Sequence, residues 1–299
     1  MLRANLIVAF ILPSILLQIS LLFADTGRIP SEYGEVIFKR NEKSANQLHI
    51  VGISHRDTFT RMNGNNTSRV QAEVYKIAEW FIHQRGLDLL LPEGFFSSKP
   101  VKTRSEKASP GRSSECKETA DVKVLEGILS DNHKFINAEM LLKQHHPVRL
   151  QQVENIASYN DVTKALHNLV NSGRNSINYL LLKSEVEYLQ ERRLAAMLQR
   201  IPEVINAEFR QGMIKGKEAI FTIGMNHIHE IIKYLIENRI RILSPLLASN
   251  KYGDYDAELN LIKENYGVCI IIPRTLLSDQ KVLEINKLHK VIPTKVEVE

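Results

Sequence analysis

The fold is decided by two similar stretches of sequence, 47-QLHIVGISH-55 and 219-AIFTIGMNH-227. Each begins with a short and nearly continuous apolar run, which is typical of a strand covered on both faces of a sheet. Three further strand-like runs occupy residues 87–92, 148–153 and 268–272. The runs are widely spaced and have helical patterns between them, which indicates crossover connections and a largely parallel sheet.

The segments between these runs have helical character. The clearest helix has an apolar stripe that begins at Val70, ends at Phe81, and is followed by Gly86 as a stop signal. Residues from about 155 to 217 contain no strand-like run. We therefore predict an α/β fold with a largely parallel central sheet flanked by helices, and with a helical insertion at about 155–217 between the third and fourth strands.

The N-terminus has the pattern of an export signal. A basic residue precedes an apolar stretch at residues 6–23, which Ala24 follows. The stretch is at the short end of what spans a bilayer and Pro13 interrupts it, so cleavage after Ala24 is favoured over a permanent anchor. We expect a single mature domain at 25–299 that is periplasmic or secreted, with membrane attachment only if the signal is retained.

The composition is that of an ordinary globular protein, with 24% charged and 43% hydrophobic residues. The formal net charge of +5 is too small and too evenly spread to indicate a nucleic-acid partner. The chain contains two cysteines, Cys116 and Cys269. In an oxidising compartment they could form a disulfide; alternatively, Cys269 is a buried small hydrophobe within an apolar strand.

Three of the strand-like runs end in residues that can do chemistry. The first ends in His55, the second in Glu93 and the fourth in His227. Ligands collect beyond the carboxyl ends of parallel strands, so these three side chains are expected to converge at one edge of the sheet. Two histidines and a carboxylate are a common set of ligands for a divalent metal such as Mn, Co or Zn, and the glycine of each Gly-x-x-His turn would leave room for a ligand.

Other polar residues allow alternative interpretations. His229 and Glu230 could act as an extra ligand, as orienting groups or as a proton carrier near the predicted metal. His145 and His146 are adjacent and precede a proline, which favours a solvated pair at a helix end over a ligand pair. His49 lies within a strand and is interpreted as structural.

The ordered motifs resemble those of the TraB, PrgY and GumN family, which belongs with the Tiki proteases, the erythromycin esterases and the ChaN-like proteins. Residues 48–55 resemble the first glycine-histidine motif of that family and residues 219–227 resemble the last. Residues 87–94 resemble its strand that ends in glutamate. The resemblance extends over roughly residues 47–245. This chain departs from the family pattern at Ile53, Arg193 and Asn226.

The resemblance also includes a helix. Glu191-Arg192-Arg193 is similar to the Glu-Arg-Asn motif of the family. The resemblance implies that Arg192 holds a substrate carboxylate or the transition-state oxyanion, as a fixed guanidinium can. An internal ion pair between Arg192 and Glu191 is the alternative interpretation.

The resemblance implies an exported metal-dependent hydrolase. Its substrate would be a peptide or a small ester, cleaved with a metal-activated water near Glu93, with Glu191, Arg192 and His229 as further catalytic candidates. A non-catalytic protein that binds and sequesters a peptide signal, haem or a metal is the second hypothesis. A chain that keeps the fold and has lost its chemistry is the third. Substrate choice would depend on the polar loop at 97–119 and on the helical segment after residue 155.

Overall fold

A seven-stranded sheet forms the centre of the computed structural model, which describes residues 28–54, 66–97, 120–130, 136–173, 177–245, 251–289 and 296–298. Its strands are β1 (Gly34–Arg40), β2 (Asn46–Ile53), β3 (Leu89–Pro92), β4 (Arg149–Leu150), β5 (Glu218–Gly224), β8 (Tyr266–Pro273) and β9 (Val296–Val298). From edge to edge the order is β4-β3-β5-β2-β8-β1-β9. All neighbouring strands are parallel except β1 and β8, which are antiparallel. The predicted mostly parallel sheet is therefore confirmed.

The centre of the sheet is built from β2, β5 and β8. Leu48 of β2 lies opposite Ala219 of β5 on one side and opposite Val268 of β8 on the other. All three side chains are buried. Since burying each large aliphatic side chain contributes roughly 1.5–3 kcal/mol, this apolar layer fixes the register of the three strands.

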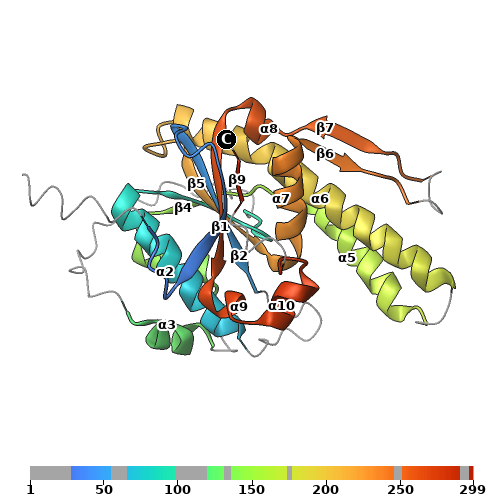
Figure 1. Cartoon of the computed structure of the whole chain (residues 1–299), viewed down its shortest axis with the longest axis horizontal. Helices are drawn as coiled ribbons and strands as arrows, with labels where there is room; N and C mark the ends of the chain where they lie inside the picture. The colour runs from blue at the N-terminus through green and yellow to red at the C-terminus, as the bar shows by residue number, and fades with distance from the viewer. Residues whose placement is uncertain are drawn as a thin grey trace, which may run out of the picture.

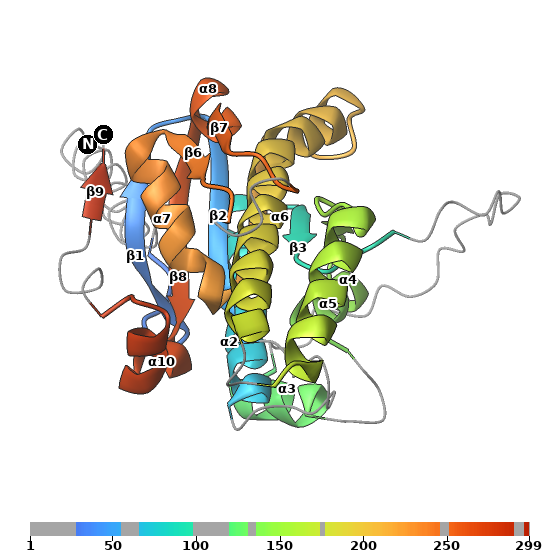
Figure 2. The same cartoon turned by 90° about the vertical axis from the view of Figure 1, so that its right-hand side faces the viewer.

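Helices cover both faces of the sheet. They are α2 (Thr67–Arg85), α3 (Val122–Leu129), α4 (Ala138–His145), α5 (Ile156–Asn171), α6 (Ile177–Arg210), the 3₁₀ turn η1 (Met225–His227), α7 (Ile228–Glu237), α8 (Asn260–Lys263), α9 (Arg274–Leu277) and α10 (Gln280–Ile285). Figure 1 shows α2 and α3 on one side of the sheet and α6 and α7 on the other. Figure 2 shows α5 running alongside α6. A separate hairpin pairs β6 (Arg239–Ile242) with β7 (Tyr255–Glu258).

Helix α2 follows the predicted apolar stripe. Val70 and Phe81 are buried against the sheet, as the helical spacing requires. The helix ends at Gly86, whose left-handed conformation (φ 68°) is one that glycine adopts without steric cost. The amide of Gly86 donates to the carbonyl of Ile82 at 3.1 Å and so closes the last turn.

The five predicted strands are all present, although β4 is shorter than predicted; β1, β6, β7 and β9 are additional strands that the sequence analysis does not predict. The runs predicted at 87–92 and 268–272 contain β3 and β8, whereas the run at 148–153 forms only the two-residue β4. The sequence does not predict β1, because its apolar residues Val36, Ile37 and Phe38 are flanked by charged residues and form too short an apolar run. Two helices, α5 and α6, lie between β4 and β5.

Two predicted segments lie outside the described residues. They are the export signal at 1–24 and all but the first residue of the polar loop at 97–119. Among the helices that the structure describes, none is both long enough and apolar enough to cross a membrane.

Candidate functional site

The two glycine-histidine motifs lie side by side at the carboxyl ends of β2 and β5. Ile53 of the first motif pairs with Gly224 of the second in the parallel ladder. A Cβ atom at Gly52 would lie 2.6 Å from the sulfur of Met225, so any side chain at this position requires Met225 to move. The expectation that this glycine leaves room for a ligand is therefore wrong, because Met225 fills the space.

Glu93 and His227 come together beside these motifs. The backbone amide of Glu93 donates to the carbonyl of Thr222 at 2.9 Å, which holds the residue against β5. Its Oε2 accepts from the amide of Gly224 at 2.7 Å, and its Oε1 lies 3.7 Å from Nε2 of His227. Both side chains are almost fully buried, at 7% and 8% exposure. The third predicted ligand, His55, lies outside the described residues.

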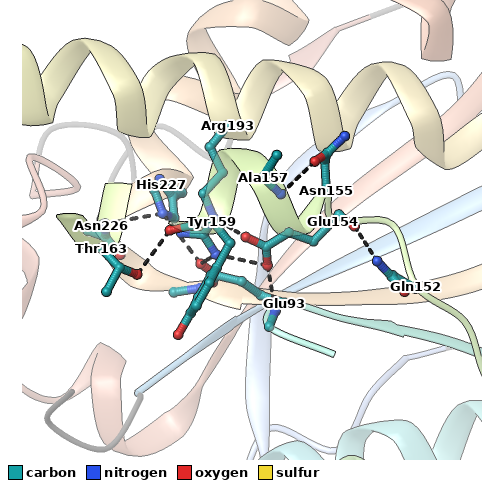
Figure 3. A network of polar contacts seen from close by, with 12 residues as sticks. Glu93, Gln152, Glu154, Asn155, Ala157, Tyr159, Thr163, Arg193, Asn226 and His227 are labelled. Atoms are coloured by element: carbon teal, nitrogen blue, oxygen red, sulfur yellow. Dashed lines mark hydrogen bonds and ion pairs between the residues drawn. The ribbon is translucent and has the colours of Figure 1, made fainter. Parts of the chain in front are cut away.

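Arg193 joins Glu93 to a second buried carboxylate, Glu154. Its Nη2 donates to Oε1 of Glu93 at 2.7 Å and to Oε2 of Glu154 at 3.0 Å. Its Nε donates to Oε1 of Glu154. Figure 3 shows Arg193 descending from α6 between the two carboxylates, with the ring of Tyr159 beside it. We call Glu93, Glu154, Arg193 and His227 the strand-end network.

Burial strengthens the electrostatic interactions between the members of the strand-end network. Glu154 is completely buried, and its Oε2 also accepts from the amide of Gly94 at 2.8 Å. Burial by itself lowers the pKa of Arg193, but the hydrogen bond to Glu154 and the charge of Glu93 outweigh burial and raise that pKa above its usual range. Two carboxylates surround one guanidinium, so the described members of the network carry one negative charge in excess when His227 is neutral.

Sequence reasoning missed Arg193 and Glu154, although both had a detectable signal. Glu154 directly follows the strand-like run at 148–153, just as Glu93 follows its own run. Arg193 lies seven residues after Val186 and four before Met197, so it shares the buried face of α6 with both. Helical spacing therefore indicates Arg193, and not Arg192, as the arginine that faces the sheet.

The other predicted catalytic residues have contacts outside the strand-end network. The guanidinium carbon of Arg192 lies 4.0 Å from the centre of the Tyr255 ring, a cation–π contact. Glu191 faces α7, where burial and then the charge of Glu230 raise its pKa. His229 has a buried Nδ1 without a hydrogen-bond partner among the residues that the structure describes. These three residues do not contact the strand-end network through any described hydrogen bond or ion pair.

A cavity of about 300 Å³ opens beside the strand-end network. Arg192 and Arg193 both line it, together with Lys251 and Asp161. Arg193 is paired with the two carboxylates of the strand-end network, and Lys251 lies 2.6 Å from Glu185, so Arg192 is the cation of this lining that has no described ion pair. A cavity lined by these cations favours a ligand that carries a carboxylate or another anionic group.

A separate group of side chains, near the C-terminal end of α2, could hold a metal ion. The ligand atoms of Glu79, His83 and His146 lie within 4.8 Å of one another. Oε1 of Glu79 is 3.5 Å from Nε2 of His146, while Lys76 donates to the other oxygen of Glu79 at 2.6 Å. The sequence analysis places His146 correctly at a helix end but does not identify this group. We call Glu79, His83 and His146 the Glu79 group.

His145 and His146 are also less solvated than predicted. The hydroxyl of Tyr75 lies 2.8 Å from Nδ1 of His145 and 3.2 Å from Nε2 of His146. His146 is half-buried, whereas His145 is exposed. The pair therefore anchors the end of α4 to α2 instead of extending freely into water.

The chain was compared with protein-family models, with curated proteins and with solved structures, and no match was found in any of the three. The geometry of the strand-end network and of the cavity beside it therefore carries the functional argument.

Proposed function

We propose that this chain is an exported metal-dependent hydrolase of the TraB and Tiki type that cleaves a peptide or a small ester. The observation that carries the proposal is the meeting of Glu93 and His227, 3.7 Å apart, where parallel strands end. Catalytic groups in parallel α/β sheets collect at this edge. Export is inferred from the signal-like residues 1–24.

The spacing of Glu93 and His227 supports a divalent ion bound by both. Two ligand atoms that are each about 2.1 Å from one ion lie about 3.4 Å apart in tetrahedral geometry, close to the 3.7 Å between Glu93 and His227. The excess negative charge of the strand-end network also favours a cation. Glu93, His227 and His55 would hold the ion, with Mn, Co or Zn as candidates. A bound ion would supply an activated water and would polarise the scissile carbonyl.

The chain's own residues orient the reacting groups. Arg193 and the amide of Gly224 each donate to one oxygen of Glu93 and so fix the direction of the carboxylate. Such outer hydrogen bonds hold a ligand in the geometry that a metal requires. The buried Glu154 holds Arg193 in place in turn.

The cationic cavity would bind the anionic end of the substrate. Arg192 and Lys251 line it, and Arg193 connects it to Glu93. A free carboxylate of a peptide would pair with these cations and place the neighbouring bond near Glu93. We interpret residues 155–217 as a helical insertion that supplies this substrate-binding side, as the resemblance of Glu191-Arg192-Arg193 to the family's helix motif implies.

The test is to measure bound metal and hydrolysis in the full-length chain and in two matched variants, His227→Gln and His83→Gln. Metal content is measured by plasma mass spectrometry, and hydrolysis with a peptide library and a nitrophenyl ester. We expect His227→Gln to lose the metal and to reduce turnover by about 100-fold or more. His83→Gln should keep turnover and the metal held by Glu93 and His227, and should lose only an ion held by Glu79, His83 and His146.

If His83→Gln lost all of the metal and His227→Gln retained it, the ion would be bound at the Glu79 group. This result would contradict the proposed function. Circular dichroism of each variant shows whether the fold is intact.

One observation favours a non-catalytic alternative, in which the site binds and sequesters a peptide signal, haem or a metal. Both oxygens of Glu93 already accept hydrogen bonds, from Arg193 and from Gly224. Both oxygens are thus occupied by donors of the protein itself. Ligand binding that persists without turnover in the metal-loaded wild-type chain would support this alternative.

A further inference from the structure

A second polar cluster lies in the middle of the sheet, within β2, β5 and β8. His49 of β2 pairs in register with Cys269 of β8, and Nδ1 of His49 is 2.9 Å from the Cys269 sulfur. The other ring nitrogen, Nε2, lies 2.6 Å from Oε1 of Glu218, the first residue of β5. We call His49, Cys269 and Glu218 the mid-sheet cluster. A thiol, an imidazole and a carboxylate are thus connected in series.

The mid-sheet cluster is held in position from above by α2. The ring of Phe81 stacks on the His49 ring, with centroids 4.0 Å apart. At the end of the same helix, Nε of Arg85 lies 3.1 Å from Oε1 of Glu218. His49 is 2% exposed, so its ring has little freedom to turn away from the thiol.

The sulfur can be reached by a small molecule. Cys269 is half-buried and lines a cavity of about 510 Å³. His49, Lys39 and Arg85 line the same cavity. Lys39 belongs to β1 and lies opposite Cys269 of β8 in the antiparallel ladder. A reactive cysteine in a protein needs this combination of partial access and cationic neighbours.

We propose that Cys269 is a reactive thiolate, paired with the imidazolium of His49, which Glu218 positions, and that it forms a mixed disulfide with a small disulfide that enters the cavity. The reacting partner belongs to the chemical class of low-molecular-weight disulfides. This site is separate from the strand-end network, which lies on the face of the sheet that α6 covers, and it does not depend on the proposed hydrolase.

The charges around the mid-sheet cluster favour the ion pair. Burial by itself lowers the pKa of His49, but the charge of Cys269 and the hydrogen bond to it, followed by those of Glu218, raise that pKa to about 9. The imidazolium form of His49 is therefore favoured when Cys269 is a thiolate. Six charged residues of the described chain face the cluster or its cavity. Lys39 pairs with Glu42, Arg85 pairs with Glu218, and Arg28 and Glu35 also line the cavity.

The backbone around Cys269 favours disulfide exchange over acyl transfer. Cys269 lies inside β8 and is paired with β1 on one side and β2 on the other. Its own amide is therefore not presented at a turn, where nucleophilic residues of acyl-transfer enzymes find amides that stabilise an oxyanion. Disulfide exchange requires no oxyanion site.

The exchange step is balanced without any further reactant. The Cys269 thiolate attacks one sulfur of the disulfide, a new sulfur–sulfur bond forms, and the bond within the small disulfide breaks. The leaving thiolate takes up the proton that His49 carries, so the imidazole becomes neutral. The products are a mixed disulfide at Cys269 and one small thiol.

The test is to measure the pH dependence of thiol modification in the full chain, after reduction and removal of the reductant. Hydroxyethyl disulfide and iodoacetamide are the probes, and peptide mass mapping separates Cys269 from Cys116. An ordinary thiol, with a pKa of about 8.5, loses about 50-fold in thiolate between about pH 8.5 and 6.5. We expect Cys269 to lose less than about fivefold over this range, because the ion pair persists.

The variant His49→Gln should restore the ordinary loss of about 50-fold, and Cys269→Ser should abolish modification of the mapped peptide. Glu218→Gln, at a residue that is only 18% exposed but lies at the start of its strand, provides a second variant if His49→Gln does not fold. It should steepen the pH profile in the same direction. An ordinary profile in the wild-type chain, or no modification of Cys269 while the chain is folded, would overturn the proposal.

Discussion

The strand-end network and the mid-sheet cluster are both buried and polar, but they are assembled in different ways. The first joins residues that follow strands β3 and β5 to a helix that crosses above them. The second joins side chains within strands, and His49 lies 220 positions from Cys269 and 169 from Glu218. Strand ends share an edge for topological reasons, whereas contacts within a sheet depend on register. The first kind of site is therefore visible in a sequence and the second is not.

The largest expected effect on stability comes from removing Arg193, the cation of the strand-end network. Arg193→Met should destabilise the chain by about 3–5 kcal/mol, because it leaves two buried carboxylates without a positive partner. The measurement is the free energy of unfolding from urea titration.

The neighbour provides the matched control for this change. Arg192→Met removes a charge one position away on α6, where the guanidinium lies on Tyr255, and should cost about 1 kcal/mol or less. Equal losses in the two variants would show that the network contributes no special stability. The double variant Arg193→Met with Glu154→Gln should recover part of the loss, since it removes one of the stranded charges.

The mid-sheet cluster should be recognised by its response to alkali. The pKa of His49 is raised from 6.5 to about 9, so its protonated form stabilises the folded chain fully below about pH 6.5. That contribution is lost as the pH rises through about 9. The free energy of unfolding, measured at intervals over this range, should fall accordingly.

The variant His49→Gln isolates this effect from other groups that titrate in alkali. Its unfolding free energy should decline less over the same interval, whatever its absolute value. Parallel curves for the variant and the wild type would mean that the pKa of His49 is not raised in the folded chain.

The smallest expected effect concerns the Glu79 group, which belongs to neither cluster. Zn²⁺ at about ten times its Kd should raise the free energy of unfolding by about 1.4 kcal/mol, because the ion would link α2 to the end of α4 through Glu79, His83 and His146. Thermal unfolding with and without Zn²⁺ measures the effect. His83→Gln should abolish it, and a Zn²⁺ effect that survives this change would contradict binding at the group.

The fold class could be predicted from the sequence because apolar runs and helical stripes are local signals. Strands β2 and β5 and helix α2 follow directly from them. Strand β1 could not be predicted in this way, because it is partly exposed and its antiparallel pairing with β8 is fixed by contacts far along the chain.

The candidate site could be predicted only in part. Glu93 and His227 follow from the rule that ligand-binding residues end parallel strands. The resemblance to a family motif led to Arg192, whereas helical spacing would have led to Arg193. His49 and Cys269 were interpreted as structural residues, because nothing local in the sequence reveals that β2 and β8 are neighbours.

Within the described residues, the shortest strands of the central sheet form its two edges: β4 has two residues and β9 has three. Exposed edge strands are the templates on which other chains add strands, and aggregation often begins there. The long apolar strands β2, β5 and β8 each have a partner on both sides. The described edges of the central sheet thus offer little backbone for intermolecular pairing, and its long apolar strands are kept from self-association.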